Sequence, residues 1–181
     1  ILGTRARKTR TKSFNAFSSI DYPETAVFRD MRLIPFLRRP DPMPPVQFYG
    51  QLDPAVFVLR LVPGMRADII PLLAPHYRAL VVESFGVGGL PGGEHGEMYA
   101  RLQDWCTSGR LAVFTTQVPH EGCDLAVYEV GRSVKELPGV LEAKDMTPEA
   151  VAVKLMWALG QTTDRAEAMR LFTTPVEWDI V

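Results

Sequence analysis

The residues best suited to proton chemistry stand at the start of the chain, in a basic run without an acidic residue. This run consists of Arg5, Arg7, Lys8, Arg10 and Lys12. If the segment is extended, Lys8 points to one side together with Ala6 and Arg10, while Arg5 and Arg7 point to the other. A lysine amine on a strand can accept and return protons, whereas an Arg- and Lys-rich arm can contact phosphates of nucleic acid. On charge alone, the simplest interpretation is that these basic side chains are exposed to solvent and have no specific role.

A glycine-rich segment, Ser84-Phe-Gly-Val-Gly-Gly-Leu-Pro-Gly-Gly93, is the second candidate site. It follows a predicted strand and precedes a predicted helix, and open parallel sheets bind ligands beyond the carboxyl ends of their strands. Pro91 occupies the third glycine position of the dinucleotide fingerprint, and no Gly-Lys-Ser/Thr follows, so neither nucleotide motif is present. A flexible strand–helix connection is an equal alternative.

The other residues that could bind a metal or react do not form a complete site. Three histidines are scattered along the chain: His76, His95 and His120. The pairing of His120 with Cys123 lacks the second pair that a tetrahedral zinc site needs, so we expect no metal and no cofactor. Cys106 and Cys123 do not make a disulfide framework, which favours reduced thiols in a cytoplasmic protein. Glu83 ends a predicted strand and is either catalytic or a capping residue.

Composition is that of a globular protein. The chain has 181 residues, of which 46% are hydrophobic and 23% charged, with a net charge of -1. Because only residues 1–12 carry a net positive charge and the rest of the chain is net negative, a uniformly basic surface for nucleic acid is excluded. No apolar run approaches the roughly 18 residues of a membrane span. We therefore expect neither nucleic acid nor membrane as a partner.

The apolar pattern predicts strands that alternate with helices. Strands are expected at 56–62, 79–84 and 111–116, with helices at 67–74 and 94–107 between them. This alternation is typical of βαβ units and a parallel sheet.

A longer helix is predicted to begin after Thr147, because Thr147 is a good N-cap and Pro148 suits the first helical position. Gly160 is expected to end it, and a second helix is expected at 164–172. The proline-rich stretch 35–53 is predicted to be neither helix nor central strand. It is either a linker or a long surface loop.

Several segments in order resemble the L-asparaginase family, in particular its cytoplasmic type I branch. The combination of Asp-Met-Thr-x-Glu-Ala with a following Lys-Leu is specific. The matching segments are Leu2-Gly-Thr-Arg-Ala-Arg-Lys8, Phe14–Pro23, Glu83–Pro91, Thr115-Thr-Gln117, Tyr128-Glu-Val-Gly131, Asp145–Ala150 and Lys154–Gly160. The resemblance implies an α/β fold: a C-terminal domain with a parallel sheet at 54–181, a linker at 35–53, and the last fragment of an N-terminal α/β domain at 1–34.

The resemblance also implies a reaction, in which L-asparagine is hydrolysed to L-aspartate and ammonia. In the family one threonine attacks the side-chain amide and forms an acyl-enzyme, and a second threonine, an aspartate and a lysine transfer protons. A threonine hydroxyl is a weak nucleophile, so it needs such a base. Lys8 matches the family lysine, which makes it the candidate catalytic residue.

Further residues match the loop that reaches a neighbouring subunit's active site, where they would bind substrate. They are Phe85, Gly86, Gly88, Gly89 and Tyr128. Family members form homodimers, often paired into tetramers, so a homo-oligomer is expected.

The chain departs from the family in what it lacks, since it contains neither Gly-Gly-Thr nor Gly-Thr-Asp-Thr. We therefore expect an N-terminal portion of the same enzyme to supply the threonines and the aspartate, and expect this chain alone to be inactive. Glu83 and Val118 replace an arginine and a cysteine of relatives under allosteric control by asparagine, so the resemblance does not extend to that control. Two other functions are consistent with these motifs: an asparaginase-like subunit of a tRNA-dependent amidotransferase, or a truncated assembly module without catalysis.

Overall fold

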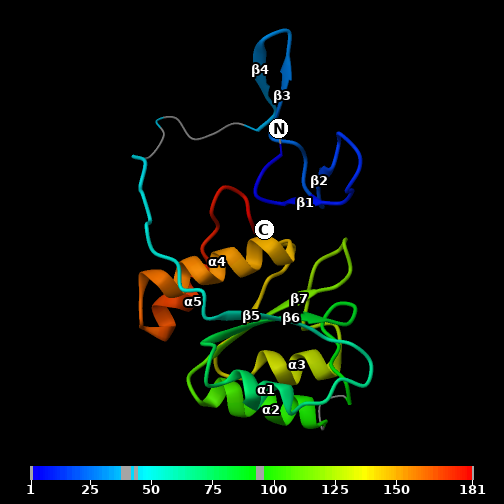
Figure 1. Ribbon diagram of the computed structural model, residues 1–181, viewed down its shortest axis with the longest axis vertical. Coiled ribbons are helices and arrows are strands. Elements are labelled where there is room, and N and C mark those ends of the chain that lie inside the picture. The colour runs from blue at the N-terminus through cyan, green and yellow to red at the C-terminus, as the bar shows by residue number, and fades with distance from the viewer. Residues whose placement is uncertain (1, 38–41, 43–44, 93–95, 181) are drawn as a thin grey trace.

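A parallel sheet of four strands lies between helices in the lower part of Figure 1, in a computed structural model that describes residues 2–37, 42, 45–92 and 96–180. The strands lie side by side in chain order: β5 (Val56–Arg60), β6 (Ala79–Ser84), β7 (Leu111–Thr116) and β8 (Val140–Glu142). All three neighbouring pairs are parallel. The predicted α/β fold with a parallel sheet is confirmed.

Helices cover both faces of this sheet (Figure 1). One face carries α1 (Ile69–Leu73), α2 (Glu97–Thr107) and α3 (Glu129–Lys135), and the other carries α4 (Pro148–Gln161) and α5 (Arg165–Thr173). Side chains alternate along β6, so Leu80 and Val82 pack toward the first face and Val81 toward the second. Two apolar cores result, one on each side of the sheet.

The N-cap of α4 is as the sequence predicted. The Thr147 hydroxyl accepts a hydrogen bond from the Ala150 amide at 3.3 Å, and Pro148 opens α4. However, α4 continues through Gly160 to Gln161, so the predicted end at Gly160 is wrong. A β-carbon at Gly160 would lie 2.7 Å from the Gln51 carbonyl oxygen, so the close approach of that segment explains the glycine.

Within the parallel-sheet part of the chain, two elements were not predicted. Strand β8 has only three residues, too few for a clear apolar pattern. Helix α3 contains Gly131, which weakens its helical pattern. A β-carbon at Gly131 would overlap the backbone of Leu125, so packing requires a glycine there. Helix α1 is also shorter than predicted and begins at Ile69.

Two antiparallel strand pairs precede the sheet. The first joins β1 (Ala6–Lys8) to β2 (Phe17–Ser19), and the second joins β3 (Ala26–Arg29) to β4 (Arg32–Pro35). The turn between β3 and β4 holds Asp30 and Met31 at φ 49° and 60°. Both central residues of a type I′ hairpin turn need positive φ. In Figure 1 this second pair lies farthest from the parallel sheet.

The segment before β5 contains no helix or strand over its described residues 45–55. It runs along α4, where the Asp53 amide donates to the Met156 carbonyl at 2.9 Å and the Gln161 amide group donates to Gln51 at 2.9 Å. Pro40 and Pro44 lie outside the described residues, and the division of the chain at 34 and 53 stays a prediction.

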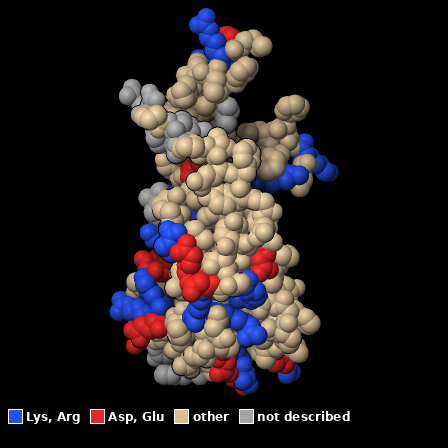
Figure 2. Space-filling view, turned by 90° about the vertical axis from the view of Figure 1, so that its left-hand side faces the viewer, with Lys and Arg blue, Asp and Glu red and all other residues tan. Residues whose placement is uncertain are grey.

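Charged side chains gather around the parallel-sheet region. Figure 2 shows Lys and Arg intermingled with Asp and Glu over its lower half, whereas in its upper half charged side chains gather mainly at the top and at the right-hand side. Among helices in the described ranges, none combines the length and apolar character needed to cross a membrane.

Candidate active site

Lys8 ends β1, where its side chain is exposed. The strand pairs antiparallel with β2, which sets Lys8 opposite Phe17. Arg5 and Arg7 point the other way and contact the C-terminal region, so the predicted alternation of faces is confirmed. Within the described residues the Lys8 amine makes no hydrogen bond or ion pair.

Arg5 anchors the strand that carries Lys8. Its side chain is only 1% exposed, and its guanidinium forms a short ion pair with the Asp145 carboxylate. It also donates to the Trp178 carbonyl at 2.9 Å and lies 4.5 Å over the Tyr22 ring. A buried guanidinium needs such partners, because desolvation of an unpaired charge is costly. Arg5 thus ties β1 to the segment just before α4.

Asp21 makes a second connection between the two regions. Its carboxylate lies 2.8 Å from His120 Nδ1 and accepts a hydrogen bond from the Glu121 amide at 2.9 Å. The hydrogen bond with His120 lowers the pKa of Asp21. The loop after β7 is therefore held against the residues that follow β2.

The glycine loop lies at the carboxyl end of β6. Phe85 and Gly89 form a bridge, while Gly86 and Gly88 have φ of 50° and 151°. A β-carbon at Gly88 would lie 2.7 Å from a methyl carbon of Leu125, so this position needs a glycine for both conformation and space. The Thr116 hydroxyl at the end of β7 donates to the Gly86 carbonyl, which fixes the loop.

Tyr128 is brought to the same edge of the sheet. The Asp124 amide donates to the Val87 carbonyl at 3.0 Å, which joins the glycine loop to the segment leading into Tyr128. Tyr128 itself is 52% exposed. The five predicted substrate-binding residues therefore lie on one edge, whereas Lys8 lies on a different element. Their roles stay predictions.

A narrow crevice separates the β1–β2 pair from the sheet. It holds ≈ 20 Å³, enough for about one water molecule, and is lined in part by Arg7, Asp21, Thr116, Asp145 and Thr147. Asparagine does not fit there.

Glu83 has a structural partner at its strand end. Its carboxylate lies 3.6 Å from the Arg60 guanidinium, and the two residues are in register between β5 and β6. Among the described residues, no group of three or more His, Cys, Asp or Glu is arranged to hold a metal ion. His95 and Gly93 lie outside those residues.

Both cysteines are free and buried. Burial raises the pKa of the Cys106 thiol to about 11 and that of Cys123 to about 12. Because the thiolate is the reactive form, we expect neither thiol to react appreciably with iodoacetamide at about pH 8 in the folded protein, and both to react after unfolding in guanidinium. Intact-mass measurement counts the adducts. Equal rates of alkylation before and after unfolding would contradict the burial of these thiols.

Comparison with known proteins identifies the family. Residues 55–172 match the glutaminase/asparaginase C-terminal domain. The chain therefore belongs to the glutaminase/asparaginase family and carries its C-terminal domain. The resemblance inferred from the sequence motifs is confirmed.

Individual relatives fall into two groups. L-asparaginase from Thermococcus kodakarensis is 35% identical, over 99% of this chain and 54% of the relative. A glutamyl-tRNA(Gln) amidotransferase subunit from Metallosphaera sedula is also 35% identical, over 95% of this chain and 39% of the relative. The chain thus spans about half the length of the asparaginase, and less of the amidotransferase subunit.

Solved structures agree with the fold. The thermostable L-asparaginase from Thermococcus kodakarensis matches with a TM-score of 0.89 at 34% identity, over 98% of this chain and 53% of that one. L-asparaginase I from Vibrio cholerae matches with a TM-score of 0.82 at 23% identity, which supports the fold alone.

The sequence motifs did not reveal Arg5 and Asp21 as the residues that join the two regions. Arg5 stood out only as one charge in a basic run. Asp145 belongs to a motif that pointed to the family but not to this ion pair. A signal was nevertheless present, because alternation along β1 places Arg5 on the face opposite Lys8.

Proposed function

We propose that this chain is part of an L-asparaginase that hydrolyses the side-chain amide of L-asparagine to L-aspartate and ammonia. Two observations support the proposal. The chain is 35% identical to an L-asparaginase over nearly its whole length. The lysine that matches the family's catalytic lysine is exposed on a strand fixed by the buried Arg5–Asp145 pair.

In the proposed reaction a threonine oxygen bonds to the amide carbon, and the carbon–nitrogen bond breaks to release ammonia. Water then cleaves the acyl-threonine ester, which yields aspartate and regenerates the hydroxyl. Lys8 takes part in the proton transfers that activate the threonine, the role that general acid–base catalysis gives to a positioned amine. The threonines and the aspartate come from an N-terminal portion of the enzyme.

The glycine loop has a separate role in this proposal. Gly86 and Tyr128 are exposed at the carboxyl edge of the sheet, so they can reach the active site of a neighbouring subunit. A homodimer or tetramer would then be needed to complete each site. We also propose a cytoplasmic location, since both cysteines are free and reducing compartments keep thiols in that state.

The experiment is to purify the protein in its native form, to measure intact masses, and to assay ammonia release from L-asparagine. We expect activity only when a portion carrying Gly-Thr-Asp-Thr is present, either in the same polypeptide or in a second one. Full activity from residues 1–181 alone would contradict the proposal.

A second function also calls for a test, because several relatives at 30–35% identity are subunits of glutamyl-tRNA(Gln) amidotransferases. Such a protein would use the same amide chemistry but deliver ammonia to a partner. Ammonia release that depends on tRNA and on a partner subunit would favour this function. Release that is independent of both favours the asparaginase.

A further inference from the structure

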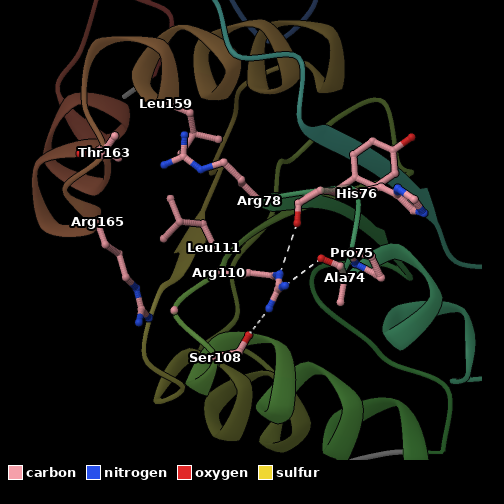
Figure 3. A pocket seen from close by; sticks show the side chains of 13 residues that line it. Ala74, Pro75, His76, Arg78, Ser108, Arg110, Leu111, Leu159, Thr163 and Arg165 are labelled. Carbon is pink, nitrogen blue, oxygen red and sulfur yellow. Dashed lines mark hydrogen bonds between the residues drawn. The ribbon is translucent and has the colours of Figure 1, made fainter.

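A second cavity, of ≈ 300 Å³, opens at the amino ends of β6 and β7. Arg78 directly precedes β6 and Arg110 directly precedes β7, while Arg165 opens α5. Together with His76, these three arginines line the cavity (Figure 3), and no acidic side chain is among the described residues that line it. The glycine loop and Thr116 lie at the opposite, carboxyl ends of the same strands.

Arg110 is held in place by neutral partners. Its guanidinium donates to the Ala74 carbonyl at 2.7 Å, to the Ser108 hydroxyl at 2.6 Å and to the Tyr77 carbonyl at 3.3 Å. These contacts fix its orientation without neutralising its charge. A guanidinium fixed in this way needs little reordering to bind an anion.

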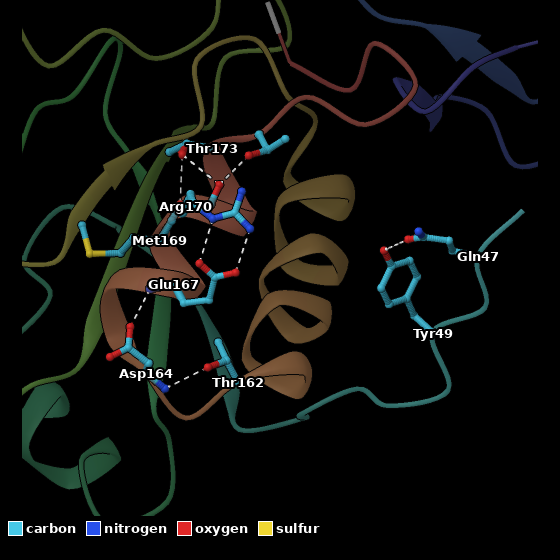
Figure 4. Close-up of polar contacts among 9 residues, drawn as sticks. Gln47, Tyr49, Thr162, Asp164, Glu167, Met169, Arg170 and Thr173 are labelled. Atoms are coloured by element: carbon cyan, nitrogen blue, oxygen red, sulfur yellow. Dashed lines mark hydrogen bonds and ion pairs between the residues drawn. The ribbon is translucent and has the colours of Figure 1, made fainter. Parts of the chain in front are cut away.

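Arg165 is positioned by the first turn of α5. The Asp164 carboxylate caps this helix by accepting from the Glu167 amide at 2.7 Å, and Glu167 pairs with Arg170 through two contacts of 2.7 Å (Figure 4). A β-carbon at Gly139 would overlap the Arg165 guanidinium, so the glycine makes room for it. Among the described residues no carboxylate forms an ion pair with Arg165 or Arg110.

Arg78 differs from these two, because Asp53 pairs with it at 2.6 Å. Two positive charges therefore remain uncompensated at the cavity, on Arg110 and Arg165. A phosphate monoester carries about two negative charges near pH 7, and guanidinium groups bind phosphate oxygens through paired hydrogen bonds. The charge and the donor type both match a phosphoryl dianion.

The remaining walls can accommodate a carbon skeleton. Leu111 and Leu159 are buried apolar residues that line the cavity beside the arginines (Figure 3). A volume of this size is at the lower end for small-molecule sites. We propose that this cavity binds a phosphoryl dianion, either free phosphate or the phosphate group of a small phosphorylated metabolite.

The proposal is tested by isothermal titration calorimetry of the full protein with inorganic phosphate and with glycerol 3-phosphate, against sodium chloride at equal ionic strength. We expect saturable binding to one site per chain. Arg165→Gln should weaken it by about tenfold or more, because a charged hydrogen bond is lost. Arg165 makes no hydrogen bond within the described fold, so this variant should keep the wild-type melting temperature. Arg110→Gln is the second variant, and Arg66→Gln, at an exposed arginine away from the cavity, is the matched control.

Tighter binding of glycerol 3-phosphate than of phosphate would identify a phosphorylated metabolite as the ligand, and equal or weaker binding would identify free phosphate. Absence of saturation beyond the chloride control would overturn the proposal. So would an affinity that is the same in wild type and Arg165→Gln. None of these results depends on asparaginase activity, so this proposal and the proposed function can fail separately.

Discussion

Replacing Lys8 with methionine should lower the kcat of the assembled enzyme by about a thousandfold, within the range that general acid–base catalysis contributes. The KM for L-asparagine should change little, because the substitution removes proton transfer rather than substrate contacts. Methionine keeps most of the length of the side chain without its amine. Steady-state kinetics of ammonia release measures both constants.

The matched control is Lys12→Met, which removes an exposed lysine from the same basic run. It should keep kcat within a few-fold of the wild type. A kcat for Lys8→Met that is as high as that of the control would show that Lys8 is not the catalytic lysine.

The second large effect is expected on stability, from Arg5→Met. This change leaves the Asp145 carboxylate without its buried partner, and breaking a buried ion pair costs about 3–5 kcal/mol. Because Asp145 is still 27% exposed, we expect a loss near the lower end of that range. Urea denaturation of the assembled protein, followed by circular dichroism, gives the free energy of unfolding.

Arg7→Met provides the comparison for this effect. Arg7 pairs with Glu149 at 3.2 Å, but its partner's side chain is 59% exposed. An exposed pair of this kind contributes about 0–1 kcal/mol. If Arg5→Met destabilises the protein no more than Arg7→Met does, Arg5 does not anchor β1 to the segment before α4.

The elements that the sequence predicted best are those with local signals. Strands β6 and β7 are continuous apolar runs, and their observed bounds match the predicted 79–84 and 111–116. Helix α4 has a threonine cap followed by proline, which fixes its start. Its end was mispredicted because Gly160 is required by packing against Gln51, and sequence alone does not distinguish a packing glycine from a terminating one.

The candidate site was predictable only where it depends on local sequence. Alternation along a strand separates Lys8 from Arg5 and Arg7, because it depends only on neighbouring residues. The partner of Arg5 is Asp145, 140 positions away in the chain. Such a contact depends on how the β1–β2 pair docks on the domain, which no local pattern encodes.

The arginine-lined cavity, too, could be predicted from the sequence only in part. Arg78 and Arg110 each stand one residue before a predicted strand, so a parallel sheet brings them to one edge. Arg165 joins them only because α5 begins beside the same cavity. The predicted topology is enough to place Arg78 and Arg110 next to each other, but it does not place Arg165.

The most direct test of the proposed asparaginase is to measure both products formed from L-asparagine by the assembled protein, without tRNA, ATP or a partner subunit. We expect aspartate and ammonia to appear in equal amounts, at a rate that saturates with substrate. No product under these conditions, with release restored only when tRNA and a partner subunit are added, would contradict the proposal and favour the amidotransferase.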